Sequence, residues 1–303
     1  MGEPLVVVAA VNGGMQRSRD GAFVPITPEE IAEDARLCRE AGASIVHVHA
    51  RDAQGANTGD PAVYAEIIRL IRERTDILIQ TTNGIGVRRD PATGELVWPT
   101  DAERLALVDL EPSPDLYGIA AGTTDFWHPE GGYPTETAYV NSPEYLKETI
   151  RAVYAKPSTL EYEIVDVHAI GRLARFADEG VFDRSAPYVW LLLGTGISDA
   201  PTEPEALAFL RNLGLSRFPN ARWGVLGAGR ENFRWATLGL AMGCHTARLG
   251  FEDGLYRADG RVAERNHHLV EELVEIAAIF GRRPATPGEA RTIMGLDRQA
   301  PGG

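Results

Sequence analysis

Two histidines stand one residue apart in the apolar segment SIVHVHAR, residues 44–51. Side chains of a strand alternate between its two faces, so His47 and His49 share one face with Ile45 and Arg51. The valines and the alanine between them suit the face that helices would cover. Two imidazoles about 6–7 Å apart along a strand can converge on one cation. The pair alone fits equally well with two core histidines that hydrogen-bond to neighbours.

A second set of charged residues lies in TARLGFEDG, residues 246–254. Alternation along a strand predicted over 246–251 turns Arg248 and Glu252 inward, and Asp253 follows where the strand ends. In a barrel the last strand pairs with the first, so Glu252 can reach the ion position that the two histidines define. Two histidines and one carboxylate leave a coordination position open, as in catalytic zinc sites, and these ligands also accept iron or manganese. The alternative is an Arg248–Glu252 ion pair that only fills the barrel.

Other polar residues stand in or after further predicted strands. They are Thr82, Asn83 and Gly84 after the third strand, Thr123 after the fourth, and Glu161 and Glu163 within the fifth, with Asp166 and His168 on the opposite face of that strand. A carboxylate in a buried strand needs a partner. Glu163 therefore either faces the polar contents of the barrel or forms a structural link to an arginine.

The segment GAGREN, residues 227–232, follows the seventh predicted strand and opens a helix. Barrels often bind phosphate at this point through loop and helix-terminal N–H groups. Gly227, Gly229 and Arg230 are therefore candidate phosphate-binding residues, and Arg230 would add positive charge. The alternative is a tight turn beside a solvated arginine.

Eight apolar segments alternate with helical patterns and would position these residues. The predicted strands are 5–11, 44–50, 77–81, 116–121, 159–167, 187–193, 222–226 and 246–251, and the predicted helices are 28–41, 61–74, 101–109, 143–155, 169–179, 203–213, 231–242 and 264–280. Alternating strands and helices predict a parallel sheet, and eight units favour a closed (β/α)₈ TIM barrel. The barrel would cover residues 1–283, with a helical tail over 284–303. A doubly wound sheet is disfavoured because GAGREN lacks the third glycine of the dinucleotide motif.

Helix starts and loop lengths can also be read from the sequence. Thr27 is the predicted N-cap of a helix with Pro28 in its first turn and Glu30 closing a capping box. Asp60 and Ser142 precede prolines in the same way. The long segments 12–26, 85–100 and 124–141 all follow strands. In a barrel such loops surround the C-terminal face, where the active site is expected.

Composition limits the partners. The formal net charge is −13, so nucleic acid and anionic membranes are not expected partners, and an anionic substrate would need local arginines. No apolar run approaches the roughly 20 residues that span a bilayer. The N-terminus lacks the basic region of a signal peptide. The two cysteines, Cys38 and Cys244, predict no disulfide framework and a reducing, cytoplasmic location.

The chain resembles the β-keto acid cleavage enzyme family essentially end to end. The resemblance rests on ITPEEIAEDARLCREAGASIVHVHARD, WGVLGAGRENF and ARLGFEDGLY, and the combination of HVHAR with RLGFED is specific. It implies a metal-dependent TIM barrel, usually a homotetramer, with acetyl-CoA as co-substrate. The implied reaction converts a β-keto acid and acetyl-CoA into acetoacetate and a new acyl-CoA. It implies Claisen and retro-Claisen steps on a zinc-bound enolate.

The resemblance also implies roles for individual residues. These are zinc binding by His47, His49 and Glu252, general-base action by Asp253 with support from Arg248, and substrate contact or ordering of the site by Thr82, Thr123 and Glu163. The chain departs from the family pattern at TTNGIG, which stands where relatives commonly read STGG. It also has Met15, near Arg17 and Arg19, where relatives that act on cationic amino-keto acids carry an acidic residue. Met15 therefore predicts a neutral apolar or anionic side chain on the substrate.

Two other functional classes fit parts of the pattern. A metal-dependent barrel hydrolase or aldolase would not use coenzyme A, but hydrolases that carry an HxH pair typically place it on the first strand. A non-catalytic metabolite-binding protein on the same barrel is disfavoured because Asp253 and Arg248 accompany all three candidate ligands. Dependence of product formation on acetyl-CoA separates these interpretations.

Overall fold

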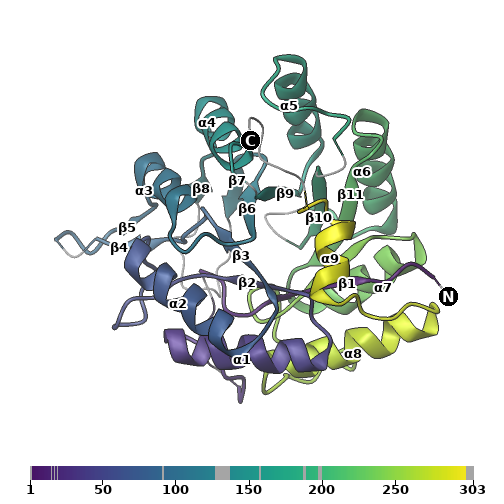
Figure 1. The fold of residues 1–303 in the computed structure, drawn as a ribbon, viewed down its shortest axis with the longest axis horizontal. Coiled ribbons are helices and arrows are strands. Elements are labelled where there is room, and N and C mark those ends of the chain that lie inside the picture. The colour runs from purple at the N-terminus through teal and green to yellow at the C-terminus, as the bar shows by residue number, and fades with distance from the viewer. Residues whose placement is uncertain are drawn as a thin grey trace.

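Eight parallel strands close into a barrel in the computed structural model, which describes residues 2–14, 16, 18, 20–90, 92–126, 137–156, 158–186, 189–196 and 200–297. The strands are β1 (Val6–Ala10), β2 (Ile45–Val48), β3 (Leu78–Thr82), β6 (Leu116–Ala120), β9 (Thr159–Ile164), β10 (Trp190–Thr195), β11 (Arg222–Gly227) and β12 (Thr246–Leu249). Their order around the barrel is β1-β12-β11-β10-β9-β6-β3-β2, so the last strand pairs with the first. Figure 1 shows the strands surrounded by helices. All eight predicted strands are present, and the predicted TIM barrel is confirmed.

Helices connect successive strands and surround the barrel. They are α1 (Pro28–Ala41), α2 (Pro61–Arg74), α3 (Asp101–Ala106), α4 (Pro143–Tyr154), α5 (Val167–Asp178), α6 (Pro204–Arg217), α7 (Asn232–Ala241) and α8 (Asn266–Ile279), with α9 (Pro287–Ile293) near the C-terminus. The Thr27 hydroxyl accepts the Glu30 N–H, and the Glu30 carboxylate accepts the Thr27 N–H in return. Asp60 and Ser142 also cap their helices as predicted.

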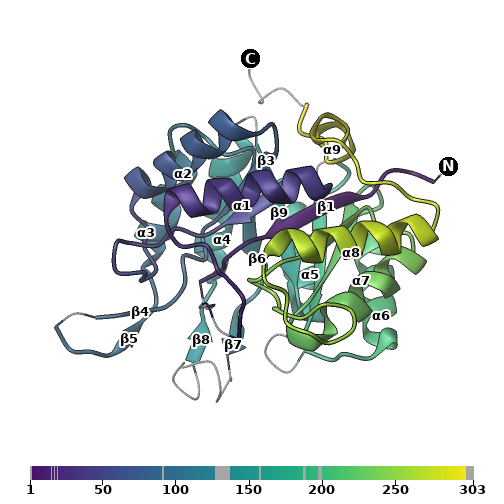
Figure 2. The ribbon, with the colours of Figure 1, turned by 90° about the horizontal axis from the view of Figure 1, so that it is seen from below.

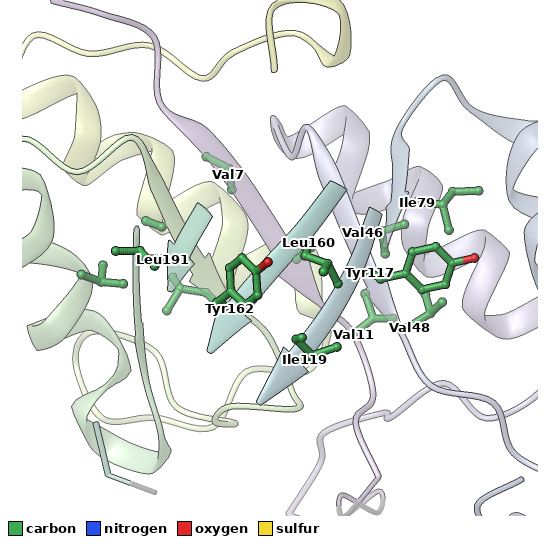
Figure 3. Packing of buried hydrophobic residues seen from close by; sticks show 14 of the residues in the cluster. Val7, Val11, Val46, Val48, Ile79, Tyr117, Ile119, Leu160, Tyr162 and Leu191 are labelled. Carbon is green, nitrogen blue, oxygen red and sulfur yellow. The ribbon is translucent and has the colours of Figure 1, made fainter. Parts of the chain in front are cut away.

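The main hydrophobic core lies between the strands and the surrounding helices. Val46 and Val48 of β2 point into it, as alternation along SIVHVHAR predicted, and the neighbouring strands contribute Ile79, Tyr117 and Leu160 (Figure 3). Burial of each such side chain contributes about 1.5–3 kcal/mol. The polar face of β2 is therefore directed to the inside of the barrel.

At the end of the barrel where the strands begin, the interior is apolar and is closed by α9. Its lining side chains come from alternate positions of the strands: Val6, Val8, Ile45, Leu78, Leu116 and Trp190. Ala290, Met294 and Leu296, in and just after α9, pack against this layer. The Arg222 guanidinium donates to the Ile293 carbonyl at 2.8 Å and so ties β11 to α9. Ligands therefore reach the polar residues of the interior from the opposite end of the barrel.

Two hairpins project from that opposite end (Figure 2). One pairs β4 (Arg88–Arg89) with β5 (Leu96–Val97), and the other pairs β7 (Thr124–Phe126) with β8 (Thr137–Tyr139). They lie within the long loops 85–100 and 124–141 that the sequence places on the catalytic face. Within the described part of the chain, no helix combines the length and apolarity that crossing a membrane requires.

The prediction of a strand extending to residue 167 is wrong. β9 ends at Ile164, and Asp166 is the N-cap of α5, where its carboxylate accepts the Ala169 N–H at 2.8 Å. His168 lies in the first turn of α5 and is exposed. The alternating Val165-Asp166-Val167 pattern imitates a strand, but the capping hydrogen bond starts the helix there.

Candidate active site

Three possible metal ligands meet inside the barrel, near the end where the strands stop. His47 belongs to β2, His49 follows directly after that strand, and Glu252 comes from the turn after β12. The His47 Nε2 lies 3.3 Å from the Glu252 Oε2, and the His49 Nε2 lies 3.5 Å from the Oε1. One ligand atom from each residue lies within 4.8 Å of the other two. The predicted proximity of these residues is therefore present in the structure.

Hydrogen bonds behind the two histidines direct their lone pairs to this point. The His47 Nδ1 lies 2.8 Å from the Gln80 Oε1, which only accepts, so Nδ1 carries the proton. The His49 Nδ1 similarly faces the Ile85 carbonyl at 3.4 Å. Both Nε2 atoms are then unprotonated, as metal-binding imidazoles require. Burial lowers the pKa of His47 to about 3, which also keeps this ring neutral.

The three residues fit a divalent cation better than they fit one another. The Glu252 Oε2 is buried and has no hydrogen-bond partner among the described residues, although two imidazoles face the carboxylate. Burial opposes ionisation of Glu252, but the Arg248 guanidinium outweighs it and holds the pKa well below its usual range. An ionised carboxylate facing two imidazole lone pairs is the donor set of a catalytic zinc or related metal site.

Close backbone approach at the barrel seam places Glu252. The predicted continuation of β12 to residue 251 is wrong because the strand ends at Leu249 and Gly250 adopts a φ of +147°. A side chain at Gly250 would overlap the Ala10 carbonyl. The Glu252 N–H then donates to the same carbonyl at 3.0 Å. Gly13, at φ +59°, leaves room for this side chain, because a Cβ there would lie 2.6 Å from the Glu252 Cγ.

Asn12 positions His49 through its backbone. The Asn12 Oδ1 accepts the His49 N–H at 3.0 Å, and the Nδ2 donates to the His49 carbonyl at 2.9 Å. The side chain therefore replaces a strand neighbour just beyond the end of β1 and holds His49 at the rim. Sequence analysis missed Asn12; its signal is an amide placed directly after the apolar run VVVAAV.

Arg248 and Asp253 form a buried, bidentate ion pair beside the metal ligands. The Arg248 Nε and Nη2 donate to the two Asp253 carboxylate oxygens at 2.9 and 2.8 Å. The same Nη2 lies 2.7 Å from the Glu252 Oε1, and Nη1 lies 3.6 Å from the Glu161 Oε1. The Arg248–Glu252 pair considered as an alternative thus exists, but it belongs to a larger network. Arg248 orients a potential base and a potential metal ligand together.

The charge of Arg248 interacts with four carboxyl groups, so not all four are readily ionised together. They are Glu161, Glu163, Glu252 and Asp253. Burial raises the pKa of Glu161 to about 8 and that of Glu163 to about 7, with Arg248 opposing both shifts. Burial also raises the pKa of Asp253 to about 6 against the influence of Arg248. A carboxylate with this pKa is a better proton acceptor than an ordinary aspartate. Glu163, predicted to face either the interior or an arginine, is partly buried, and the ion pair with Arg248 comes from Glu161.

The residues after β3 border the histidines. The Thr82 hydroxyl accepts the Gly84 N–H at 2.9 Å, and Asn83 is buried. The position of a Cβ on Gly84 would lie 3.0 Å from the Thr82 Oγ1 and 4.0 Å from the His49 Cε1. The Thr82 hydroxyl and Gly84 therefore lie beside the His49 ring.

Thr123, another predicted substrate residue, is not brought to this point. Thr123 is exposed, and its hydroxyl accepts the Asn141 N–H at 3.1 Å, which fixes the loop between β6 and α4. Met15 lies outside the described residues.

The loop after β11 contacts the potential base. The Gly229 N–H donates to the Asp253 carbonyl at 2.6 Å, so this N–H serves the loop contact instead of a phosphate. Gly227 packs against the start of the following helix, where a Cβ would lie 2.7 Å from the Glu231 carbonyl oxygen. Arg230 is exposed at the rim, with its guanidinium 4.0 Å from the centre of the Tyr256 ring. Of the three candidates, Arg230 has the side chain best placed for an anion.

Comparison with known proteins gives matches over the whole chain. The family model "beta-keto acid cleavage enzyme" matches residues 4–296. A 3-keto-5-aminohexanoate cleavage enzyme from Fusobacterium nucleatum subsp. nucleatum is 33% identical over 98% of this chain and 100% of its own length. A 3-oxoadipate:acetyl-CoA acetyltransferase from Cupriavidus necator is 29% identical, with 98% and 96% covered. The solved structure of apo ObcA has a TM-score of 0.71 at 17% identity; the match covers 90% of this chain and 65% of that one, so this likeness concerns the fold.

Proposed function

Because the chain belongs to the β-keto acid cleavage enzyme family, we propose that it exchanges acyl groups between a β-keto acid and acetyl-CoA. The products are acetoacetate and a new acyl-CoA, so the β-keto acid loses its acyl group to coenzyme A while its carboxymethyl carbon gains acetyl. The observation that carries the proposal is the Arg248–Asp253 pair held next to His47, His49 and Glu252.

His47, His49 and Glu252 are the residues that would hold a divalent metal, and we propose zinc. The bound metal supplies a Lewis acid that stabilises negative charge developing on the keto oxygen of the substrate. The neutral His47 imidazole and the ionised Glu252 carboxylate support this assignment, as does the Glu252 Oε2, which has no hydrogen-bond partner among the described residues.

Asp253 is the proposed general base. It takes a proton from C2 of the β-keto acid, and Arg248 holds both carboxylate oxygens so that one face of the carboxylate remains directed to the substrate. The resulting carbanion attacks the acetyl-CoA carbonyl, and coenzyme A leaves as its thiolate. The thiolate then attacks the original acyl carbonyl, and cleavage of the bond between that carbonyl and C2 forms the new acyl-CoA and the acetoacetate carbanion, to which Asp253 returns the proton.

We assign the binding of anionic groups of coenzyme A to Arg230, with Gly227 and Gly229 shaping the loop. The net charge of −13 makes a local cation necessary for a polyanionic ligand. Met15 supports a neutral apolar or anionic substrate side chain. The relatives do not decide the charge of the substrate side chain, because one is named for a cationic and another for an anionic β-keto acid. The proposal therefore rests on Met15. We further propose a homotetramer, from family membership, and a cytoplasmic location, which two buried, unpaired cysteines support.

The test is a panel of β-keto acids with cationic, neutral and anionic side chains, assayed with acetyl-CoA for acetoacetate and new acyl-CoA. Elemental analysis of the purified protein identifies the metal. The Asp253→Asn variant keeps the size of the side chain and should lose at least about 10²-fold in turnover, as expected for a general base. Product formation that does not depend on acetyl-CoA would instead support a hydrolase or aldolase. Turnover that prefers cationic substrates would refute the assignment of Met15.

A further inference from the structure

Tyr139, at the end of β8, has a buried hydroxyl that faces the site. The residue is 8% exposed, and its Oη has no partner with hydrogen-bond geometry in the part of the chain that the structure describes. The position that a Cβ on Gly84 would occupy lies 3.6 Å from this Oη, 3.0 Å from the Thr82 Oγ1 and 4.0 Å from the His49 Cε1. The Tyr139 hydroxyl, the Thr82 hydroxyl and the His49 ring thus all border Gly84.

The Tyr139 ring is held firmly from two sides. The Trp98 ring lies 5.0 Å from it between centroids, and the Trp98 indole N–H donates to the Thr137 hydroxyl at 2.8 Å. These contacts join the hairpin β7–β8 to the segment after β5. The Arg104 guanidinium carbon lies 5.1 Å from the centroid of the Tyr139 ring. A buried ring that is fixed in this way presents its hydroxyl in one direction.

Arg104 is a buried cation behind the phenol. Its side chain is 3% exposed, and it donates to the Asn141 Oδ1 at 2.9 Å and to the Val140 carbonyl at 3.1 Å. Its ion-pair partner Asp101 is 58% exposed, so solvent screens that charge while the guanidinium stays in the interior. The positive charge of Arg104 beside the Tyr139 ring favours donation of a hydrogen bond from the Tyr139 hydroxyl to an anion.

Glu252, Asp253, Glu161 and Glu163 crowd the side of the site next to Arg248, and carboxyl groups offer few hydrogen-bond donors to an anionic substrate. A β-keto acid carries a carboxylate that needs hydrogen-bond donors away from these groups. Burial raises the pKa of the Tyr139 phenol, so the hydroxyl stays protonated and can donate. The Thr82 hydroxyl already accepts the Gly84 N–H and can donate its own proton to a ligand beside Gly84.

We propose that the Tyr139 hydroxyl, with Arg104 behind it, donates a hydrogen bond to the carboxylate of the β-keto acid. Tyr139 is then a specificity-determining residue that selects acids over their esters. The inference rests on the proposed function, because it assumes that a β-keto acid occupies the metal site.

The test is binding of acetoacetate and of its methyl ester to the metal-loaded enzyme, measured by calorimetry without acetyl-CoA. Tyr139→Phe removes the hydroxyl and keeps the ring against Trp98. We expect the Kd for acetoacetate to rise about tenfold or more, as for a lost hydrogen bond to a charged group. The Kd for methyl acetoacetate should change less than about twofold. In turnover, KM for the β-keto acid should rise while KM for acetyl-CoA stays constant.

The matched control is Tyr145→Phe. Tyr145 lies on α4 against the same guanidinium, 3.9 Å from its ring centroid, and its buried hydroxyl also lacks a partner with hydrogen-bond geometry among the described residues. This variant should bind both ligands like the wild type. Equal weakening of acid and ester by Tyr139→Phe, an unchanged Kd for the acid, or the same loss in Tyr145→Phe would overturn the inference alone. Wild-type protein that neither binds acetoacetate nor turns over any β-keto acid would overturn the proposed function as well.

Discussion

Replacing Gly13 by alanine should weaken metal binding although no proposed ligand is substituted. Gly13 has a φ of +59°, and an added Cβ would stand 2.6 Å from the Glu252 Cγ. Carbon atoms prefer separations of about 3.5–4.0 Å, so Glu252 must retreat by roughly 1 Å. Metal–ligand distances tolerate only about 0.2 Å, so we expect metal affinity to fall about 10–100-fold. The left-handed backbone should also cost about 1–2 kcal/mol of folding stability.

Gly243→Ala separates the two effects. Gly243 has a similar φ of +77° with no atom within 4 Å of the added Cβ, so it carries the backbone cost alone. Zinc affinity, measured by competition with a chromogenic chelator, should fall in Gly13→Ala and stay at the wild-type value in Gly243→Ala. Both variants should show a lower thermal midpoint without metal. Wild-type zinc affinity in Gly13→Ala would refute the claim that close packing at the seam places Glu252.

Three further predictions concern residues that are not themselves proposed ligands. Burial raises the pKa of Asp34 to about 7, so the folded state disfavours its carboxylate and the free energy of unfolding should fall as pH rises from about 4 to about 7. Asp34→Asn should remove this slope, at most about 1.4 kcal/mol per pH unit, in urea titrations across that range; an unchanged slope would contradict the assignment. Met294→Ala should lower the free energy of unfolding by about 2–5 kcal/mol while KM stays constant, because it opens a cavity at the closed end of the barrel. Asn12→Ala should lower zinc affinity about tenfold by freeing the backbone of His49, as measured by chelator competition, and full affinity would refute that role.

Short-range rules predicted much of the fold from the sequence. Thr27 and Glu30 form their capping box with neighbours three residues away, so the pattern alone specifies the bonds. Alternation placed His47 and His49 inward because the opposite face of β2 is entirely apolar. The same rule failed at Asp166, where a cap imitates strand alternation. It also failed at Gly250, where the chain turns to approach Ala10.

Long-range contacts in the site could not be derived in this way. Gln80 supports His47 from the neighbouring strand, and only the polar side chain within the run ILIQT hints at it. Tyr139 reaches Gly84 from a hairpin 55 positions along the chain, a distance over which sequence spacing carries no geometric information. The role of Glu161 depends on the common reach of Arg248 across β12 and β9. Such contacts depend on barrel closure, which the sequence predicts, and on side-chain directions at strand ends, which it does not.

The closed end of the barrel has a consequence for biosynthesis. The residues that seal it, Ala290 and Met294, are among the last of this sequence to leave the ribosome, whereas Val6 and Val8 beneath them are among the first. Until α9 has been synthesised and has docked, this apolar layer stays exposed. Messages truncated shortly before residue 287 should therefore yield chains that carry every proposed ligand and yet aggregate.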